Sequence, residues 1–335
     1  MAYIQFKNIV KNYGRSVVLK NINLEIEKGQ LVTLLGPSGC GKSTLLRCLA
    51  GLEDLTSGEI YLDGKNITNL SPREREMGMV FQQYSLFPNM TVEQNVAFGL
   101  KLKKVEKQEM KERVDRMIEI VGLKDKKASY PSQLSGGQQQ RAALARAIVM
   151  EPKVLLLDEP LSAIDALLRK NLQVEIRRIQ KELDITAIFV THDQEEAMVM
   201  SDEIHLLYEG RVEQSAKPTE LYRNPKTLFA ASFIGNYNLI PAERFMWLTK
   251  EKVKCEQVAI RPEMIRIHPG YLEEEDTYQI RGIIKESLPH GNILRYTVNA
   301  GEQELHVDVL FSDEEEYQPG SECYLSIKKG DCIFL

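Results

Sequence analysis

The sequence predicts an α/β domain followed by a small all-β domain, and three observations support this prediction. The apolar run 31–35 leads into a glycine-rich loop and then into a helix-forming segment. Two more apolar runs, 154–157 and 187–190, are followed by acidic residues and by a histidine, as at the carboxyl ends of parallel strands that carry a site. Beyond residue 235, short alternating segments replace the helices.

Length and composition indicate a two-domain protein of the cytosol. The chain has 335 residues, more than one compact domain usually holds. Its net charge of −5 argues against a protein that coats nucleic acid. No apolar run of about 18 residues is present to span a membrane, and residues 1–6 lack the basic start of a signal peptide. The five cysteines have no C-x-x-C spacing, which indicates reduced thiols rather than disulfides or a zinc site.

The first thirty residues alternate and turn like an antiparallel edge, with a turn predicted at 11–14. Tyr13 stands in this turn, close in sequence to the glycine-rich loop. Its ring could stack on a purine, or it could simply pack against the protein.

The glycine-rich loop, residues 36–44, has the pattern G-x-x-x-x-G-K-[ST] of a phosphate-binding loop. Its glycines let the backbone approach a phosphate chain, and the helix that follows offers free amides and the positive end of its dipole. Lys42 can reach the β- and γ-phosphates, the Ser43 hydroxyl can ligate Mg²⁺, and Thr44 could support the phosphates. We expect Cys40 to contribute its backbone amide rather than redox chemistry. The predicted phosphate-binding residues are Gly36, Ser38, Gly39, Cys40, Gly41, Lys42, Ser43 and Thr44.

The next predicted strand, 77–81, is followed by Gln82. Its carboxamide could ligate Mg²⁺, orient a water or remain an ordinary solvated side chain. Apolar residues in the loop 84–90 predict a docking surface, unless they pack inward. Residues 92–122 show the apolar spacing of helices.

A second glycine-rich helix start lies at residues 134–141. Ser135, Gly136, Gly137 and Gln138 precede an alanine-rich segment, so exposed amides would form a second anion site here. One phosphate tail does not obviously need both loops. Either both loops wrap one nucleotide, or the second loop serves a nucleotide held by another copy of the chain.

Two further strand ends carry candidate catalytic groups. Asp158 can hold Mg²⁺ through water, and Glu159 can polarise an attacking water. A long helix is predicted after the segment 162–165, and the strand beyond it ends at His192. This histidine could contact a γ-phosphate or have a structural role.

Taken together, these motifs resemble the ATP-binding subunit of an ABC transporter. The chain carries a Walker A loop (36–44), a Q-loop at Gln82, a signature motif (134–138), Walker B (154–159), a D-loop (162–165) and a switch histidine, His192, each once and in the family's order. The resemblance covers about residues 1–235, with Ile164 where the family usually has Leu, a mild difference. It implies a P-loop NTPase domain of ABC type with an antiparallel β subdomain and a helical subdomain.

The resemblance also implies ATP and Mg²⁺ as cofactors, and a homodimer, or a pair with a similar chain, with two ATP molecules in its interface. Tyr13 would then stack on adenine, while Ser135, Gly136 and Gly137 would contact the ATP of the opposite subunit. Gln82 and the segment 84–87 would couple hydrolysis to a membrane partner. The implied catalytic residues are Lys42, Gln82, Glu159 and His192, the implied metal ligands are Ser43, Gln82 and Asp158, and Gln138 joins the nucleotide-binding residues.

Residues 236–335 form the second predicted domain, after residues 1–235. Strands are predicted at 258–260, 265–267, 278–283, 293–298, 305–309 and 323–327. Such strands fit a small OB-like barrel that could bind nucleic acid or a small ligand, or act as an interaction module, which we favour. The acidic runs 273–275 and 314–316 disfavour nucleic acid. The segment 261–263, Arg-Pro-Glu, resembles the opening of the TOBE domain of importer ATPases, which implies a regulatory or dimerising role.

The leading hypothesis is the ATPase subunit of an ABC importer, bound at the cytoplasmic face of the cell membrane to two permease subunits and dependent indirectly on an extracytoplasmic solute-binding protein. The resemblance places it among importers of polyamines, iron(III), phosphonates, sugars or sulfate, and we prefer polyamine, then phosphonate, then iron(III). The competing hypothesis is a soluble ABC ATPase that acts on ribosomes or DNA. Such proteins usually carry tandem ATPase modules or a coiled-coil insertion, whereas this chain has one module and an acidic balance.

Overall fold

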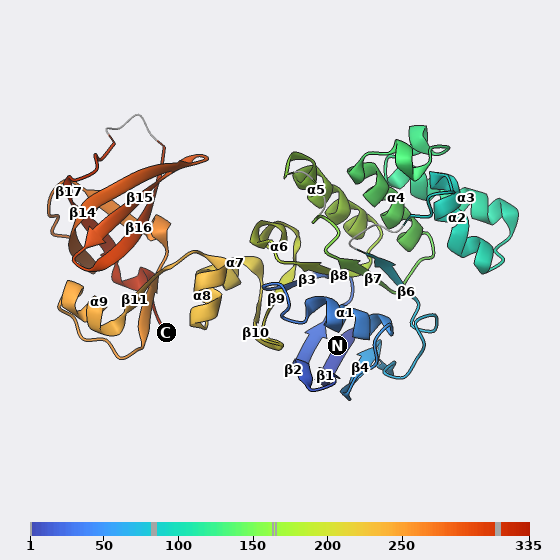
Figure 1. Cartoon of the computed structure of the whole chain (residues 1–335), viewed down its shortest axis with the longest axis horizontal. Coiled ribbons are helices and arrows are strands. Elements are labelled where there is room, and N and C mark those ends of the chain that lie inside the picture. The colour runs from blue at the N-terminus through green and yellow to red at the C-terminus, as the bar shows by residue number, and fades with distance from the viewer. Residues whose placement is uncertain (1, 82–85, 163, 165, 312–315) are drawn as a thin grey trace. The chain divides into compact units, whose positions relative to one another are not determined.

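The computed structural model describes residues 2–81, 86–162, 164, 166–311 and 316–335. The chain divides into two compact units, Met1–Thr219 and Glu220–Leu335, whose elements are labelled in Figure 1. This division lies earlier in the chain than the domain boundary expected after residue 235, which stays a prediction. Among the described helices, none is long and apolar enough to cross a membrane.

The first unit is built on a six-stranded sheet with the order β10-β9-β3-β8-β7-β6. Its strands are β3 (Leu31–Leu35), β6 (Met77–Val80), β7 (Val154–Asp158), β8 (Thr186–Thr191), β9 (Glu203–Tyr208) and β10 (Arg211–Ala216). Neighbouring strands run parallel, except that β10 is antiparallel to β9. Side chains alternate between two cores: Val154 and Leu156 lie in one, Leu155 and Leu157 in the other. Burial on both faces explains why these strands are continuous apolar runs.

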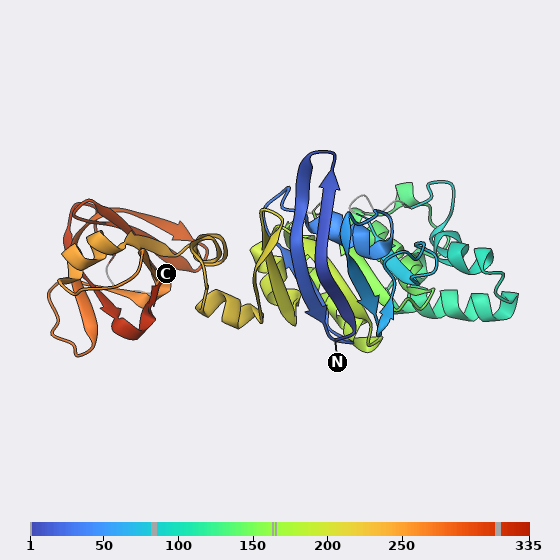
Figure 2. The same ribbon diagram turned by 90° about the horizontal axis from the view of Figure 1, so that it is seen from below.

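One face of this sheet packs against an antiparallel sheet, β2-β1-β4-β5, and the first helix. These elements are β1 (Ile4–Tyr13), β2 (Ser16–Ile26), β4 (Ser57–Leu62), β5 (Lys65–Asn66) and α1 (Lys42–Ala50). Figure 2 shows β1 and β2 as a long hairpin, which confirms the predicted antiparallel subdomain. The expected turn at 11–14 was misplaced, because the strand pairing continues through Tyr13 and the turn falls at Gly14 and Arg15.

The opposite face packs against helices. They are α2 (Val92–Leu102), α3 (Lys107–Ile120), α4 (Gly136–Ile148), α5 (Ala166–Glu182) and α6 (Gln194–Met200). Helix α2 begins directly after its N-cap Thr91, because the Thr91 side chain accepts from the Gln94 amide while the Gln94 side chain accepts from the Thr91 amide. In Figure 1, α1 lies on the lower side of the sheet and α4 and α5 on its upper side.

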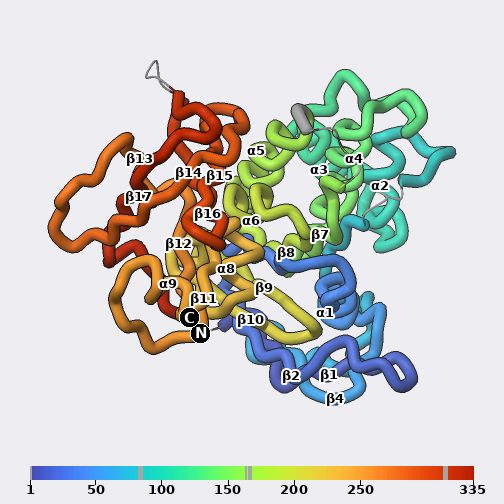
Figure 3. The backbone as a smooth tube through the Cα atoms, turned by 60° about the vertical axis from the view of Figure 1, so that its left-hand side comes forward, coloured from blue at the N-terminus to red at the C-terminus, as the bar shows by residue number. Residues whose placement is uncertain are grey.

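The second unit holds two antiparallel sheets, with the orders β11-β12-β18 and β13-β17-β14-β15-β16. Figure 3 traces the backbone of this unit in orange to red. The strands are β11 (Asn238–Pro241), β12 (Gln257–Ile260), β13 (Ile265–His268), β14 (Thr277–His290), β15 (Ile293–Ala300), β16 (Gln303–Leu310), β17 (Glu322–Lys328) and β18 (Cys332–Phe334). The helices near and within this unit are α7 (Pro218–Arg223), α8 (Leu228–Ile234) and α9 (Ala242–Thr249). All six strands predicted here are confirmed. The sequence analysis missed β11 and β18, of four and three residues. It also missed the helix α9, because the domain was expected to be all-β.

Candidate nucleotide site

The predicted phosphate-binding loop lies between β3 and α1, at the carboxyl edge of the central sheet. Two of its glycines have conformations that a larger residue would strain. Gly36 has φ 154°, and a Cβ there would lie 2.1 Å from the Leu207 carbonyl oxygen. Gly41 has φ 105°, and a Cβ there would lie 2.7 Å from the Leu19 side chain. The loop therefore holds its tight curve because these positions lack side chains.

Helix α1 begins at this loop without a side-chain cap, since its N-cap residue is Gly41. Its first amides are therefore not occupied by a capping side chain, and they can bind an anion. Ser38 and Gly39 are exposed, whereas Cys40 is buried. Burial raises the pKa of the Cys40 thiol, although the nearby Lys42 ammonium opposes that rise. A neutral buried thiol fits the expectation that Cys40 contributes its backbone and not redox chemistry.

Lys42 lies inside the loop and is only 4% exposed. Its ammonium donates to the Gly36 carbonyl at 2.7 Å and to the Pro37 carbonyl at 2.9 Å. A lysine held by two loop carbonyls can exchange them for phosphate oxygens with a small movement of its side chain. The cation is thus available where the predicted phosphate chain would lie.

Ser43 and Asp158 meet across the sheet edge. The Ser43 hydroxyl donates to Asp158 Oδ1 at 2.6 Å, and Asp158 is buried. Arg47 of α1 lies 3.7 Å from the other carboxylate oxygen. The structure therefore brings together two of the three residues predicted to hold a metal ion. The third, Gln82, lies outside the described residues.

Glu159 and His192 stand at the ends of the neighbouring strands β7 and β8. His192 Nδ1 lies 3.7 Å from Glu159 Oε2. Glu159 has φ 46°, an uncommon conformation for a residue other than glycine, and its amide donates to the Val190 carbonyl at 3.1 Å. The D-loop residue Ser162 donates in turn to the Glu159 carbonyl, from both its amide and its hydroxyl. A carboxylate and an imidazole thus lie side by side, an arrangement that can accept a proton from water and hold charge beside it.

The sequence analysis missed a set of residues that support Glu159 and His192 through hydrogen bonds and an ion pair. Buried Glu196 accepts from the Thr191 hydroxyl at 2.5 Å, one residue before His192. Burial raises the pKa of Glu196, and the Thr191 hydrogen bond opposes that rise. Arg169 approaches Glu196 at 3.7 Å and donates to the Ile164 carbonyl of the D-loop at 3.0 Å. These contacts connect the D-loop with the strand end that carries His192.

Tyr13 lies at the end of β1 with its side chain 46% exposed, so part of its ring is open to a ligand. The Lys11 ammonium lies 4.7 Å from the centroid of this ring. Burial raises the pKa of Tyr13, and the nearby Glu53 carboxylate adds to the rise. Neither Lys11 nor Glu53 was predicted to be near the site.

The second glycine-rich helix start lies on the other side of the sheet from α1, as Figure 1 shows for α4. Ser135 caps α4: its hydroxyl accepts from the Gln138 amide, and the Gln138 side chain accepts from the Ser135 amide. A hollow of about 230 Å³ beside Ser135 is lined by residues of α4 and α5 and by no residue of the phosphate-binding loop. This hollow therefore does not join the two loops.

The segment after Gln82 packs partly inward. Leu86 lies against the helical core, and the Phe87 ring packs at a tilt against Phe98 of α2, with 4.5 Å between ring centroids. The Asn95 side chain accepts from the Phe87 amide and donates to its carbonyl, and Phe87 remains 37% exposed. Inward packing is thus confirmed for Leu86 and Phe87, and the docking surface stays a prediction. The first residues of this loop, 84 and 85, lie outside the described chain.

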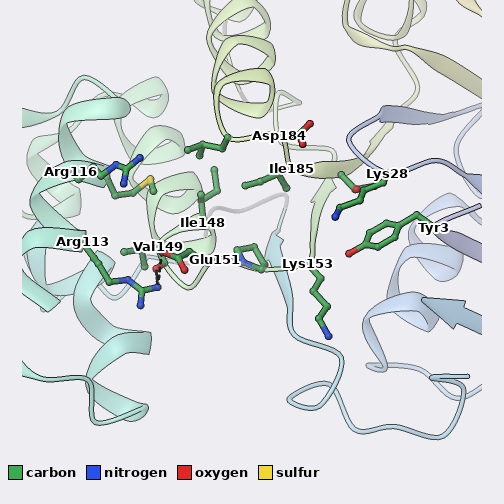
Figure 4. Close-up of a pocket in the computed structure, with 14 residues that line it drawn as sticks. Tyr3, Lys28, Arg113, Arg116, Ile148, Val149, Glu151, Lys153, Asp184 and Ile185 are labelled. Carbon is green, nitrogen blue, oxygen red and sulfur yellow. Dashed lines mark hydrogen bonds and ion pairs between the residues drawn. The ribbon is translucent and has the colours of Figure 1, made fainter. Parts of the chain in front are cut away.

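A larger hollow of about 370 Å³ lies at the opposite edge of the sheet (Figure 4). Figure 4 shows Tyr3 and Lys28 on one side of it and Arg113 and Arg116 of α3 on the other. Its lining includes residues that directly precede β7 and β8, whereas the groups described above follow those strands. This hollow is therefore separate from the candidate nucleotide site.

Comparison with known proteins assigns each part of the chain to the family that its motifs resemble. Residues 19–162 match the family model described as "ABC transporter", and residues 258–335 match the one described as "TOBE domain". The protein of known structure cbiO1 from Clostridium perfringens, described as part of the ABC transporter complex cbiONQ, is 34% identical with a TM-score of 0.62 over 66% of this chain and 90% of its own.

Curated relatives match nearly the whole chain. The Fe(3+) ions import ATP-binding protein FbpC of Vibrio cholerae is 43% identical over 90% of this chain and 89% of its own length. The spermidine/putrescine import ATP-binding protein PotA of Haemophilus influenzae is 44% identical over 95% of this chain and 91% of its own length. PotA of Thermotoga maritima is 43% identical over 89% and 87%. The chain therefore belongs to the ABC transporter family, as the ATP-binding subunit of an importer that carries a TOBE domain.

Proposed function

We propose that two copies of this chain close around two ATP molecules at the cytoplasmic face of the membrane and drive two permease subunits that import a polyamine. The observation that carries the catalytic part is the meeting of Lys42, the Ser43–Asp158 pair and the Glu159–His192 pair at one sheet edge. The same arrangement supports ATP as the nucleotide that an ABC ATPase binds.

The proposed reaction is attack by water on the γ-phosphorus of ATP. Glu159 accepts the proton from water as the new oxygen–phosphorus bond forms, and the bond to the bridging oxygen of ADP breaks. Lys42 and the α1 amides neutralise charge on the phosphates, and His192 stabilises the γ-phosphate beside Glu159. Gln82, as proposed from its family motif, orients the site and links it to the permease.

The residues present fit Mg²⁺, which would supply charge neutralisation on the β- and γ-phosphates. Ser43 and Asp158 offer hydroxyl and carboxylate oxygens, the ligand types Mg²⁺ prefers, at hydrogen-bond distance from each other. Mg²⁺ usually keeps several waters and takes only one or two carboxylates, so a compact set of three or more acidic ligands is not required. Ser43 would bind directly and Asp158 through water.

The proposed dimer follows from the two separate glycine-rich helix starts. The hollow beside Ser135, Gly137 and Gln138 is lined by no residue of the phosphate-binding loop, and we propose that these residues and Gly136 contact ATP held by the other copy. ATP then favours the closed dimer because it binds both halves, and hydrolysis removes that preference.

The proposed solute is a polyamine, supported by the spermidine/putrescine import relatives. The iron relative supports iron(III) as the second candidate. In cells lacking the chain, labelled spermidine uptake should fall and return with the wild-type chain but not with Glu159→Gln. Restored iron(III) uptake with unchanged spermidine uptake would overturn the polyamine proposal in favour of iron.

The catalytic proposal is tested with Glu159→Gln and the control Glu195→Gln, an exposed glutamate of α6 paired with Lys170. Glu159→Gln should lower kcat for ATP hydrolysis by roughly 10²- to 10⁴-fold and leave ATP binding in place, because only the general base is lost. Glu195→Gln should retain its rate. A near-normal rate for Glu159→Gln would show that another group accepts the proton.

A further inference from the structure

Lys11 is a buried cation beside the nucleotide site that the catalytic scheme does not use. It lies on β1 and is 8% exposed. Its ammonium donates to the Asp54 carbonyl at 2.6 Å and lies 3.1 Å from Glu53 Oε2. The same ammonium is 4.7 Å from the centroid of the Tyr13 ring. Three contacts thus fix one cation among a strand, a loop and an aromatic ring.

These contacts join two parts of the chain that are distant in sequence. Glu53 and Asp54 follow the end of α1, the helix that begins at the phosphate-binding loop, whereas Tyr13 ends β1. Lys11 therefore sets the position of the Tyr13 ring relative to the helix that carries the loop. Because it is buried and doubly held, moving it would cost its ion pair and a hydrogen bond.

The position of Lys11 also decides which face of the ring is open. A cation over an aromatic face is attracted to the negative charge of that face and excludes another planar group from it. Tyr13 is nevertheless half exposed, so a base must approach from the side away from Lys11. The Glu53 carboxylate balances the Lys11 charge, which leaves no net cation there to attract phosphate.

We propose that Lys11, held by Glu53, is a positioning residue for recognition of the adenine base. It acts through Tyr13 and does not contact the phosphates. This inference rests on the proposed stacking of Tyr13 on adenine. It predicts that loss of Lys11 weakens the contact with the base while the phosphate cradle and the hydrolytic step stay intact.

The structure offers a matched control on the same strand. Lys7 lies 4.5 Å from the centroid of the Tyr61 ring, a contact of the same kind that is away from the phosphate-binding loop. Four variants of the full chain separate the roles: Lys11→Met, Lys11→Arg, Lys7→Met and Tyr13→Ala. If Lys11→Met fails to fold, Glu53→Gln loosens Lys11 by removing the anion that holds it. Because this variant also leaves the Lys11 charge unbalanced, the expected result is a rise in KM for ATP relative to the tripolyphosphate inhibition constant. The readouts are KM and kcat for ATP, and inhibition by inorganic tripolyphosphate, which has phosphates but no base.

Lys11→Met should raise KM for ATP about five-fold, because a Tyr13 ring that Lys11 no longer holds must be ordered when the base binds. The kcat value and the tripolyphosphate inhibition constant should stay unchanged. Lys11→Arg should restore most of the affinity, and Lys7→Met should match the wild type. Adding Lys11→Met to Tyr13→Ala should cause no further rise in KM, because both changes remove one contact.

Equal weakening of ATP and tripolyphosphate by Lys11→Met, or a KM no higher than that of Lys7→Met, would overturn the inference while leaving the stacking proposal standing. A wild-type KM for Tyr13→Ala would refute the stacking proposal and the inference together. Neither result would bear on hydrolysis by Glu159, which the kcat values report separately.

Discussion

The two glycine-rich helix starts of the first unit differ in whether side chains cap their backbone amides. At α1 the N-cap is Gly41, no side chain caps the helix, and Lys42 reaches back into the loop. At α4 the Ser135 and Gln138 side chains cap the helix reciprocally, and the helix itself contains no lysine. The first arrangement leaves backbone amides of α1 free to bind an anion. In the second, the capping side chains already accept from the Gln138 and Ser135 amides, and the surface consists of a hydroxyl and small residues. Similar sequence patterns thus yield one binding loop and one complementary surface.

The largest expected effect is a difference between substitutions in the phosphate-binding loop and at the Ser135 surface: the first should lower ATP affinity and the second should lower the rate of hydrolysis. Lys42→Ala should weaken ATP binding about 100-fold, because a charge-assisted contact to phosphate is lost. Ser135→Arg should change ATP affinity of the isolated subunit by less than about three-fold and yet lower kcat about 100-fold, because it blocks closure and not the cradle. Equilibrium binding and steady-state rates measure both. Equal loss of affinity in the two variants would break the distinction.

A second prediction compares the backbones of the two loops. Gly36→Ala should lower the free energy of unfolding by about 1–3 kcal/mol, because its Cβ would meet the Leu207 carbonyl oxygen. Gly136→Ala should change it by less than about 0.5 kcal/mol, since no atom lies within 4 Å of the added Cβ. Urea unfolding of both variants checks this. A comparable loss in both would mean that the second loop is as constrained as the first.

The smallest expected effect is a dependence of the free energy of unfolding on pH, caused by a histidine on β9, next to the strand that leads into the phosphate-binding loop. Burial lowers the pKa of His205 to about 4, and this residue pairs with Leu34, just before the loop. Because unfolding restores a pKa near 6.5, the unfolded chain binds the proton first, and stability falls as pH drops from about 6.5 to about 4. The loss should be about 1 kcal/mol between pH 7.5 and pH 6.

His205→Gln provides the control, since glutamine does not titrate in this range. The variant should lose that part of the pH dependence of its unfolding free energy, whatever its absolute stability. An unchanged slope between pH 7.5 and pH 6 would show that other groups cause it.

The sequence was sufficient to locate functional groups that stand in short motifs directly after strands. Glu159 and His192 could be predicted because parallel strands bring their carboxyl ends to one edge, whatever the chain does between them. Lys11 could not be predicted in this way, because its partner Glu53 lies forty-two positions away on a different element. The pairing of Arg169 with Glu196 was missed for the same reason, because it joins α5 to α6 and arises only when these helices pack. Their contacts to Ile164 and Thr191 are local, five positions away in each case.

In both units, features that depend on strand pairing could not be predicted from the sequence. In the second unit, strands with clear alternation were predicted correctly, whereas β18, three residues long, became visible only through its pairing with β12. The position of the turn between β1 and β2 was missed because strand pairing, and not the residues of the turn, decides where the hairpin ends.

The central claim is that the binding loop of one chain works with the Ser135 surface of another, and a mixing experiment tests it most directly. Lys42→Ala and Ser135→Arg chains should each be inactive alone. Mixed and allowed to exchange, they should regain ATP hydrolysis, up to about a quarter of the wild-type rate if sites act independently, because half of the dimers would then contain one intact composite site. A mixture that stays as inactive as its components, although exchange of labelled chains is observed, would contradict the claim.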